Sequence, residues 1–149
     1  MDTESSGDPL GIALLSEIAV AEQLAQTQLK RALPKGMEVS HFSVLNHFAR
    51  LGGEKTPAQL ARAFHVTKGA MTNTLSRLES AGYVHIRPDW DDGRRKRVSI
   101  SEAGLTARNE AAAAVAPVFD DVASRLGSDK IRSVLPVLRD LRELLDEDD

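Results

Sequence analysis

Apolar residues recur every three or four positions between Leu10 and Leu29, which is the spacing of one face of an amphipathic helix. Asp8 and Pro9 are suited to begin this helix, as its N-cap and its first-turn residue. The turn-forming residues Pro34 and Gly36 are suited to end it. The pattern therefore predicts a long N-terminal helix with one apolar stripe.

A second helix is expected to begin at a cap formed by Ser40. Its buried stripe would include Leu45, Phe48 and Leu51, and the glycine pair that follows would close it.

The next segment predicts a helix-turn-helix. Residues 56–59 read Thr-Pro-Ala-Gln, a capping box with proline at the first helical position, so a short third helix should start there. Thr67 is suited to cap a fourth helix, in which Met71, Leu75 and Leu78 form the apolar stripe. Short helices joined by a tight turn are the hallmark of this motif.

The apolar period then changes from about 3.6 to 2. Val84 and Ile86 alternate with polar residues, and so do Val98 and Ile100, while the polar segment 88–95 separates the two runs. This pattern predicts a β-hairpin with a long charged loop.

Two further helices are expected after the hairpin. Ser101 would cap an alanine-rich helix that reaches about Leu126, with a kink at Pro117. Pro136 predicts a bend or a break in the last helix. The apolar stripe of that helix comprises Ile131, Val134, Leu138, Leu141 and Leu145.

The predicted fold class is mainly α with a small β-hairpin, a winged helix-turn-helix flanked by N- and C-terminal helices. Residues 37–104 would form the winged helix. Residues 1–36 and 105–149 would form a helical dimerisation region, because a compact winged helix cannot cover their apolar stripes alone. We therefore expect a homodimer.

Charge is distributed unevenly along the chain. The net charge is −3, but residues 57–99 contain eight cations and four carboxylates, so this segment is positive and the remainder is negative. Residues 94–97 are four consecutive cations, among them Arg94 and Arg95. A basic centre predicts a polyanionic partner. The predicted hairpin with its loop, residues 84–100, would be the wing of the winged helix, and its arginines suit a narrow minor groove of DNA. Asp92 is placed to pair with Arg94 and orient it. The alternative is that these charges bind no partner and only keep the hairpin tip soluble.

The fourth helix offers a second candidate surface. With its apolar stripe turned inward, the opposite face is polar and lacks carboxylates until Glu79, as a surface laid against phosphates and base edges would be. This face comprises Lys68, Gly69, Thr72, Asn73, Ser76 and Arg77.

Three motifs in this region resemble those of the MarR (multiple antibiotic resistance regulator) family. They are Leu-Glu-Ser-Ala-Gly-Tyr-Val at 78–84, Asp-Gly-Arg at 92–94 and Val-Ser-Ile-Ser-Glu-Ala-Gly at 98–104. The resemblance implies an obligate dimer that binds a pseudo-palindromic operator in double-stranded DNA. It also implies that Arg94 enters the minor groove, and that the groove-facing helix carries Thr67, Lys68, Thr72, Asn73 and Arg77. The chain departs from the family pattern at Gly93, Trp90 and Asn73.

The resemblance further implies a repressor that a small aromatic or phenolic effector relieves. The crevice for that effector would be lined by Met37, Phe42, Leu45, Phe48 and Phe119. A stripe of methionine and phenylalanine is also what an ordinary core provides, so the residues leave both interpretations open.

Other functions are disfavoured. The chain has no cysteine, and His41 and His47 are six residues apart, which does not place them on one helical face, so we expect no metal, cofactor or redox switch. No catalytic motif is present, and an enzyme is not expected. The sequence has neither a signal peptide nor a membrane span, so a cytoplasmic protein without membrane contact is expected. The alternative function is a winged-helix module that binds protein instead of DNA.

Overall fold

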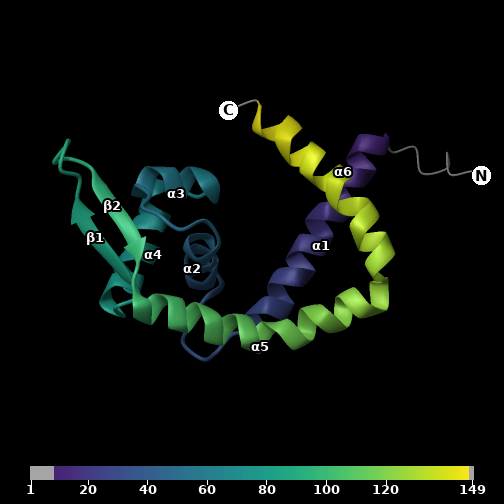
Figure 1. Cartoon of the computed structure of the whole chain (residues 1–149). Helices are drawn as coiled ribbons and strands as arrows, with labels where there is room; N and C mark the ends of the chain where they lie inside the picture. Colours follow the sequence, from purple (N-terminus) through teal and green to yellow (C-terminus); the bar gives the residue numbers. More distant parts are fainter. Residues whose placement is uncertain (1–8, 148–149) are drawn as a thin grey trace, which may run out of the picture. The chain divides into compact units, whose positions relative to one another are not determined.

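The computed structural model describes residues 9–147, which form six helices and a two-stranded antiparallel hairpin (Figure 1). The predicted fold class is therefore confirmed. The expected cap Asp8 lies outside the described residues, and the first helix begins directly after Pro9. In chain order the elements are α1 (Leu10–Ala32), α2 (Val39–Leu51), α3 (Pro57–Ala63), α4 (Lys68–Ser80), β1 (Val84–Pro88), β2 (Lys96–Ile100), α5 (Glu102–Leu126) and α6 (Ser128–Asp146).

The described chain divides into two compact units. The first ends at Ala114 and contains α1 to the hairpin with the first half of α5, and the second begins at Val115. The boundary falls inside α5. The predicted division at residues 36 and 105 into a winged helix and a dimerisation region stays a prediction.

The helix-turn-helix forms where its capping residues predict it. The Gln59 backbone N–H donates to Thr56 Oγ1 (3.1 Å), and the Thr56 backbone N–H donates to Gln59 Oε1 (2.8 Å), which completes the capping box of α3. At the start of α4 the Ala70 backbone N–H donates to Thr67 Oγ1 (3.0 Å). These caps satisfy N–H groups that the first turn of each helix leaves free, and so they set where α3 and α4 begin.

The core of the first unit is mostly aliphatic, with one buried phenylalanine, and lies between the helix-turn-helix, α2 and the hairpin (Figure 1). The stripe of α4 meets side chains from every neighbouring element, which fixes how α4 is rotated and therefore which face it turns to solvent. The cluster comprises Val44, Leu45 and Phe48 of α2, Leu60 and Ala61 of α3, Met71, Leu75 and Leu78 of α4, and Val84, Val98 and Ala107.

The hairpin pairs in a register that places Ile86 opposite Val98. A third segment joins the sheet at one residue: the Lys55 N–H donates to the Val98 carbonyl (3.0 Å), and the Val98 N–H donates to the Lys55 carbonyl (2.8 Å). The sequence does not predict this bridge, because one paired residue produces no alternating pattern. It holds the middle of the hairpin to the segment before α3.

Two local expectations were wrong. The cap of α2 is Glu38 and not Ser40, because Glu38 is the last extended residue and its N–H donates to Nδ1 of His41 (3.3 Å), three residues on. Ser40 therefore lies inside the helix. The other error concerns Leu51, which was expected in the buried stripe of α2 and is 62% exposed. At Pro136 the helix α6 continues without a break, and the expected bend stays a prediction. A proline removes one backbone hydrogen-bond donor, and the hydrogen bonds of the other residues keep the helix continuous.

Large apolar side chains of α1 and α6 are exposed in the single chain. Leu10, Val20 and Leu24 of α1 are more than half exposed, as are Val137 and Leu144 of α6. No helix within residues 9–147 is long and apolar enough to cross a membrane. The helices α1 and α6 therefore expose apolar side chains, but neither is apolar enough to span a membrane.

Candidate nucleic-acid interface

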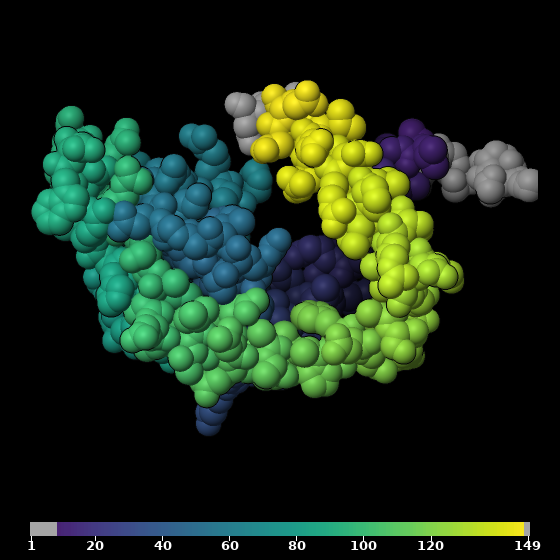
Figure 2. All heavy atoms as spheres, in the orientation of Figure 1, coloured from purple at the N-terminus to yellow at the C-terminus, as the bar shows by residue number. Residues whose placement is uncertain are grey.

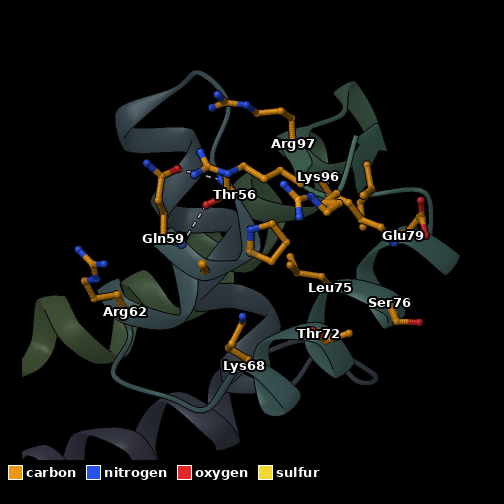
Figure 3. Close-up of a pocket in the computed structure, with 15 residues that line it drawn as sticks. Thr56, Gln59, Arg62, Lys68, Thr72, Leu75, Ser76, Glu79, Lys96 and Arg97 are labelled. Carbon is orange, nitrogen blue, oxygen red and sulfur yellow. Dashed lines mark hydrogen bonds between the residues drawn. The ribbon is translucent and has the colours of Figure 1, made fainter. Parts of the chain in front are cut away.

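A hollow of about 680 Å³ lies between α3, α4 and the hairpin of the first unit (Figure 3). We call it the wing hollow. In the close-up Lys68, Thr72 and Ser76 follow one another along α4, and Lys96 extends from β2. Its lining comprises Thr56, Pro57, Ala58, Gln59 and Arg62 from α3 and its cap, Lys68, Thr72, Leu75, Ser76 and Glu79 from α4, and Ile86, Arg94, Arg95, Lys96 and Arg97 from the hairpin.

The wing hollow is strongly cationic. Among residues 9–147, six cations line it and Glu79 is the only carboxylate that does. Like charges gathered around a concave surface create a positive potential that attracts a polyanion. An α-helix of 13 residues is about 20 Å long and fits the major groove of B-DNA, which is about 12 Å wide. The lining of the hollow therefore has the charge to attract a DNA duplex, and α4 has the size to lie in its major groove.

The tip of the hairpin is organised by Asp92. One carboxylate oxygen accepts the Arg94 backbone N–H (3.1 Å) and lies 3.5 Å from Arg94 Nε, while the other lies 3.7 Å from Arg95 Nε. The Arg94 side chain is nevertheless 94% exposed, so this contact directs the guanidinium without covering it. An exposed pair of this kind contributes little to stability, and its consequence is the direction in which Arg94 points.

A second carboxylate holds the loop from inside. Asp89 is buried; its Oδ1 accepts the Asp91 N–H (3.0 Å) and its Oδ2 accepts Arg97 Nε (3.2 Å), while its own N–H donates to the Arg95 carbonyl (3.0 Å). The backbone hydrogen bond from Asp91, together with the Arg97 guanidinium, lowers the pKa of Asp89 although burial acts to raise it. A lowered pKa means that the charged carboxylate stabilises the loop at neutral pH, and that this contribution disappears only as the pH falls through the acid range.

Replacing Asp89 with alanine is expected to loosen the loop without unfolding the protein. The variant leaves the Asp91 N–H and the Arg97 guanidinium without their acceptor, so amide hydrogen exchange should quicken across residues 89–95 and stay unchanged in α4. Mass spectrometry of peptic fragments measures this, with Asp91→Ala as the control that removes an exposed carboxylate of the same loop. Equal exchange in both variants would show that Asp89 does not organise the wing.

Residues 35–95 match the model of the MarR family, and this is the segment that builds α2, α3, α4 and most of the wing. This part of the chain is similar to the MarR family. A mutant of Escherichia coli MarR complexed with operator DNA has a similar fold, with a TM-score of 0.75 and 24% identity over 95% of this chain and 99% of that one.

Other solved structures share the fold. The transcriptional regulator BldR from Sulfolobus solfataricus has a TM-score of 0.77 and 22% identity, and the match covers 99% of each chain. An organohalide-sensing transcriptional regulator in its 2,4-dichlorophenol-bound form has a TM-score of 0.76 and 22% identity over 96% of this chain and 85% of that one. At this level of identity, the likeness establishes a common MarR-type fold for the whole described chain.

The nine residues predicted to contact DNA are all exposed, but they divide into two groups. The wing hollow contains Lys68, Thr72, Ser76, Arg94 and Arg95. The others lie on the same helix or at its cap and do not line the hollow, and they are Thr67, Gly69, Asn73 and Arg77.

Three cations of the wing hollow were not among the predicted site residues: Arg62, Lys96 and Arg97. Lys96 and Arg97 belong to the cationic run of the wing, and Arg62 belongs to the basic segment 57–99. The distribution of charge along the sequence could therefore have indicated all three. Which of these side chains turn toward α4 depends on how the hairpin packs, and this is a tertiary property.

The residues predicted to line an effector crevice have different surroundings. Leu45 and Phe48 are 0% and 1% exposed and belong to the core, so the core interpretation of the stripe holds for them. Phe42 is half-buried, and Phe119 belongs to the second unit. Met37 is the exception, because it lines a separate hollow.

That separate hollow, which we call the Met37 hollow, has a volume of about 480 Å³ and lies in the first unit. Arg77 reaches it from α4, and its guanidinium is 3.9 Å from the Glu38 carboxylate. His41 also lines it, with a buried Nε2 that has no hydrogen-bond partner within the described chain. The full lining is Pro34, Lys35, Gly36, Met37, His41, Arg77, Leu78, Ala81, Tyr83, Ala107 and Glu110.

The two histidines considered as metal ligands have other roles. His41 completes the cap of α2, and the His47 ring packs edge-on against Phe64 with 5.3 Å between centroids. Among residues 9–147, no three histidine, cysteine or acidic side chains gather as a metal-binding group.

Proposed function

We propose that this chain is a MarR-family, sequence-specific regulator of transcription that binds double-stranded DNA through the wing hollow, as a repressor that a small-molecule effector releases. The observation that carries the proposal is the lining of the hollow, where six cations from α3, α4 and the wing surround an exposed polar helix face. Such a regulator acts in the cytoplasm on a pseudo-palindromic operator. Its chemistry is binding, and no group in the hollow is assigned to catalysis.

The decisive test is the affinity for duplex DNA at several salt concentrations. The full chain is titrated into a labelled duplex from the region upstream of its own gene and into a random duplex, and the binding is followed by anisotropy. Binding through phosphates releases counterions, so the affinity should fall steeply with salt for both duplexes and stay higher for the upstream one. Affinity that is absent or independent of salt would favour the alternative, a winged-helix module that binds protein.

Arg94 and Asn73 should contribute differently to binding. Arg94→Ala is expected to weaken binding to many sequences and to reduce the salt slope by about one unit, because the minor groove is read mainly through charge and width. Asn73→Ala is expected to lose about 1–3 kcal/mol on the preferred site alone, because major-groove base edges carry the sequence code. Asp92→Ala should act as a milder form of Arg94→Ala, since it frees the guanidinium without removing it.

The matched control is Arg31→Ala, which removes an exposed cation at the end of α1 that lines neither hollow. All variants are measured on both duplexes at two salt concentrations. If Arg94→Ala bound like the control, the wing would be a solvated hairpin and not a DNA contact.

The effector is assigned to the Met37 hollow. Arg77 supports this assignment because it lies both on the predicted DNA-facing side of α4 and in the hollow, where it faces Glu38. An aromatic or phenolic molecule that displaced this contact would change the position of Arg77 and so alter the DNA contact. The expected result is that phenols and aromatic acids release the labelled duplex from the wild type and not from Met37→Trp, which fills the hollow. Release from both proteins would place the effector elsewhere.

A further inference from the structure

Trp90 is the only tryptophan of the chain and stands at the tip of the wing with 82% of its surface exposed. It lies outside the lining of the wing hollow, although its loop also carries Arg94 and Arg95. An exposed apolar side chain is common on protein surfaces. What sets Trp90 apart is that its surroundings hold it in place.

The ring rests on a guanidinium that is itself fixed. The Arg87 Cζ atom lies 5.5 Å from the centre of the Trp90 ring, within the range of a cation–π contact. The same guanidinium donates two hydrogen bonds to the Glu54 carboxylate, from Nε (2.9 Å) and Nη2 (2.6 Å). Paired hydrogen bonds of this kind hold an arginine in one plane. Glu54 is next to Lys55, which is bridged to the middle of β2, so the support under the ring is itself joined to the hairpin.

The backbone around Trp90 is held as well. The residue before it, Asp89, is buried and accepts the N–H of the residue after it, Asp91 (3.0 Å), so Trp90 lies within a closed turn. The indole ring is therefore presented to solvent from a closed turn, with one face on the Arg87 guanidinium. A rigid aromatic group of this kind gains contact area at a small cost in conformational entropy when a partner arrives.

We propose that Trp90 is a DNA-contacting residue that packs its ring against the sugars of the duplex beside the groove that Arg94 enters. The inference rests on the proposed function. The charge of the loop identifies the partner, because the Arg94 and Arg95 side chains are 94% and 65% exposed and the ring itself lies on a guanidinium. A positive surface with an aromatic centre matches a sugar–phosphate backbone. Arg87 and Glu54 are positioning residues in this arrangement.

The experiment uses the intrinsic fluorescence of the full chain, which reports on Trp90 alone among tryptophans. Quenching by acrylamide is measured with and without a saturating unlabelled duplex. The expected result is that the quenching constant falls severalfold when DNA is bound. Trp90→Ala should weaken binding to both duplexes by roughly tenfold, as the loss of an aromatic contact to a nucleotide does. Trp90→Phe should restore most of this loss, and Glu54→Gln should give a smaller one.

Leu105→Ala is the matched control, because it removes an exposed apolar side chain of α5 that lines neither hollow, and it should bind like the wild type. Anisotropy of the labelled duplex measures binding independently of Trp90. If DNA binds and the quenching constant does not change, or if Trp90→Ala binds like the control, the inference is wrong and the proposed function stands. Quenching that varies with protein concentration in the absence of DNA would place Trp90 in a protein contact and also overturn it. Absence of any DNA binding would overturn both.

Discussion

Substituting Gly104 with alanine is expected to lower the free energy of unfolding by about 3 kcal/mol or more, since this change forces an atom into occupied space. A Cβ atom on Gly104 would collide with the backbone carbonyl oxygen of Tyr83 and would lie 2.9 Å from Cγ1 of Ile100. The carbonyl cannot easily move, because it accepts the Ser101 N–H (3.0 Å). The substitution would therefore push the start of α5 away from the strand that leads into the wing.

Chemical denaturation at a fixed protomer concentration measures this loss, because the stability of a dimer depends on concentration. Gly69→Ala is the matched control. A Cβ atom there meets nothing within 4 Å, so alanine in the first turn of α4 should leave stability equal or raise it by up to about 1 kcal/mol. Similar losses in both variants would mean that the close approach at Gly104 is unimportant.

We also expect sedimentation at micromolar concentration to give a dimer, at twice the chain mass of 16.2 kDa. The stripe of α6 has the alternating three- and four-residue spacing of a coiled-coil seam, and within it Val134 and Leu138 are 42% and 37% exposed in the single chain. Apolar surface of this extent is rare on a stable monomer. The double variant Val134→Glu/Leu138→Glu should therefore sediment as a monomer.

The same variant should lose operator affinity by roughly 100-fold or more, because two linked DNA-binding modules gain at least that factor over one. The expected operator has half-sites about 10 bp apart, one turn of DNA. Lys130→Glu is the control, since it places a new carboxylate on an exposed position of α6 outside the stripe. A wild type that sediments as a stable monomer, or a footprint over one asymmetric half-site, would contradict the dimer.

Much of this fold could be predicted because its signals are local. Thr56 and Thr67 cap the helices of the helix-turn-helix with partners three residues away, and the α4 stripe faces inward as its period requires. A hydrogen bond to a near neighbour, or a helical period, depends only on adjacent sequence. The same holds for the cationic run of the wing and for Ser101, whose Oγ accepts the Gly104 N–H (2.9 Å) as a cap should.

Local pattern failed where one residue had competing roles. Ser40 has the chemistry of a cap, but the turn before α2 places Glu38 at the last extended position. The Glu38 N–H then donates to Nδ1 of His41, which completes the cap. Leu45 and Phe48 have the chemistry of a ligand crevice, but packing against α3 and α4 places them in the core. Composition could not separate these alternatives, since an apolar side chain lines a pocket or fills a core according to what lies opposite it.

The arrangement of the wing depended on contacts between distant segments. Glu54 binds Arg87, 33 positions along the chain, and Lys55 pairs with Val98. Neither pair repeats with any period, because each joins single residues that meet only after the hairpin has packed on the core. The caps, stripes and charges could therefore be inferred from neighbours in the chain, whereas the shape of the wing hollow and the support under Trp90 follow from packing that brings remote residues together.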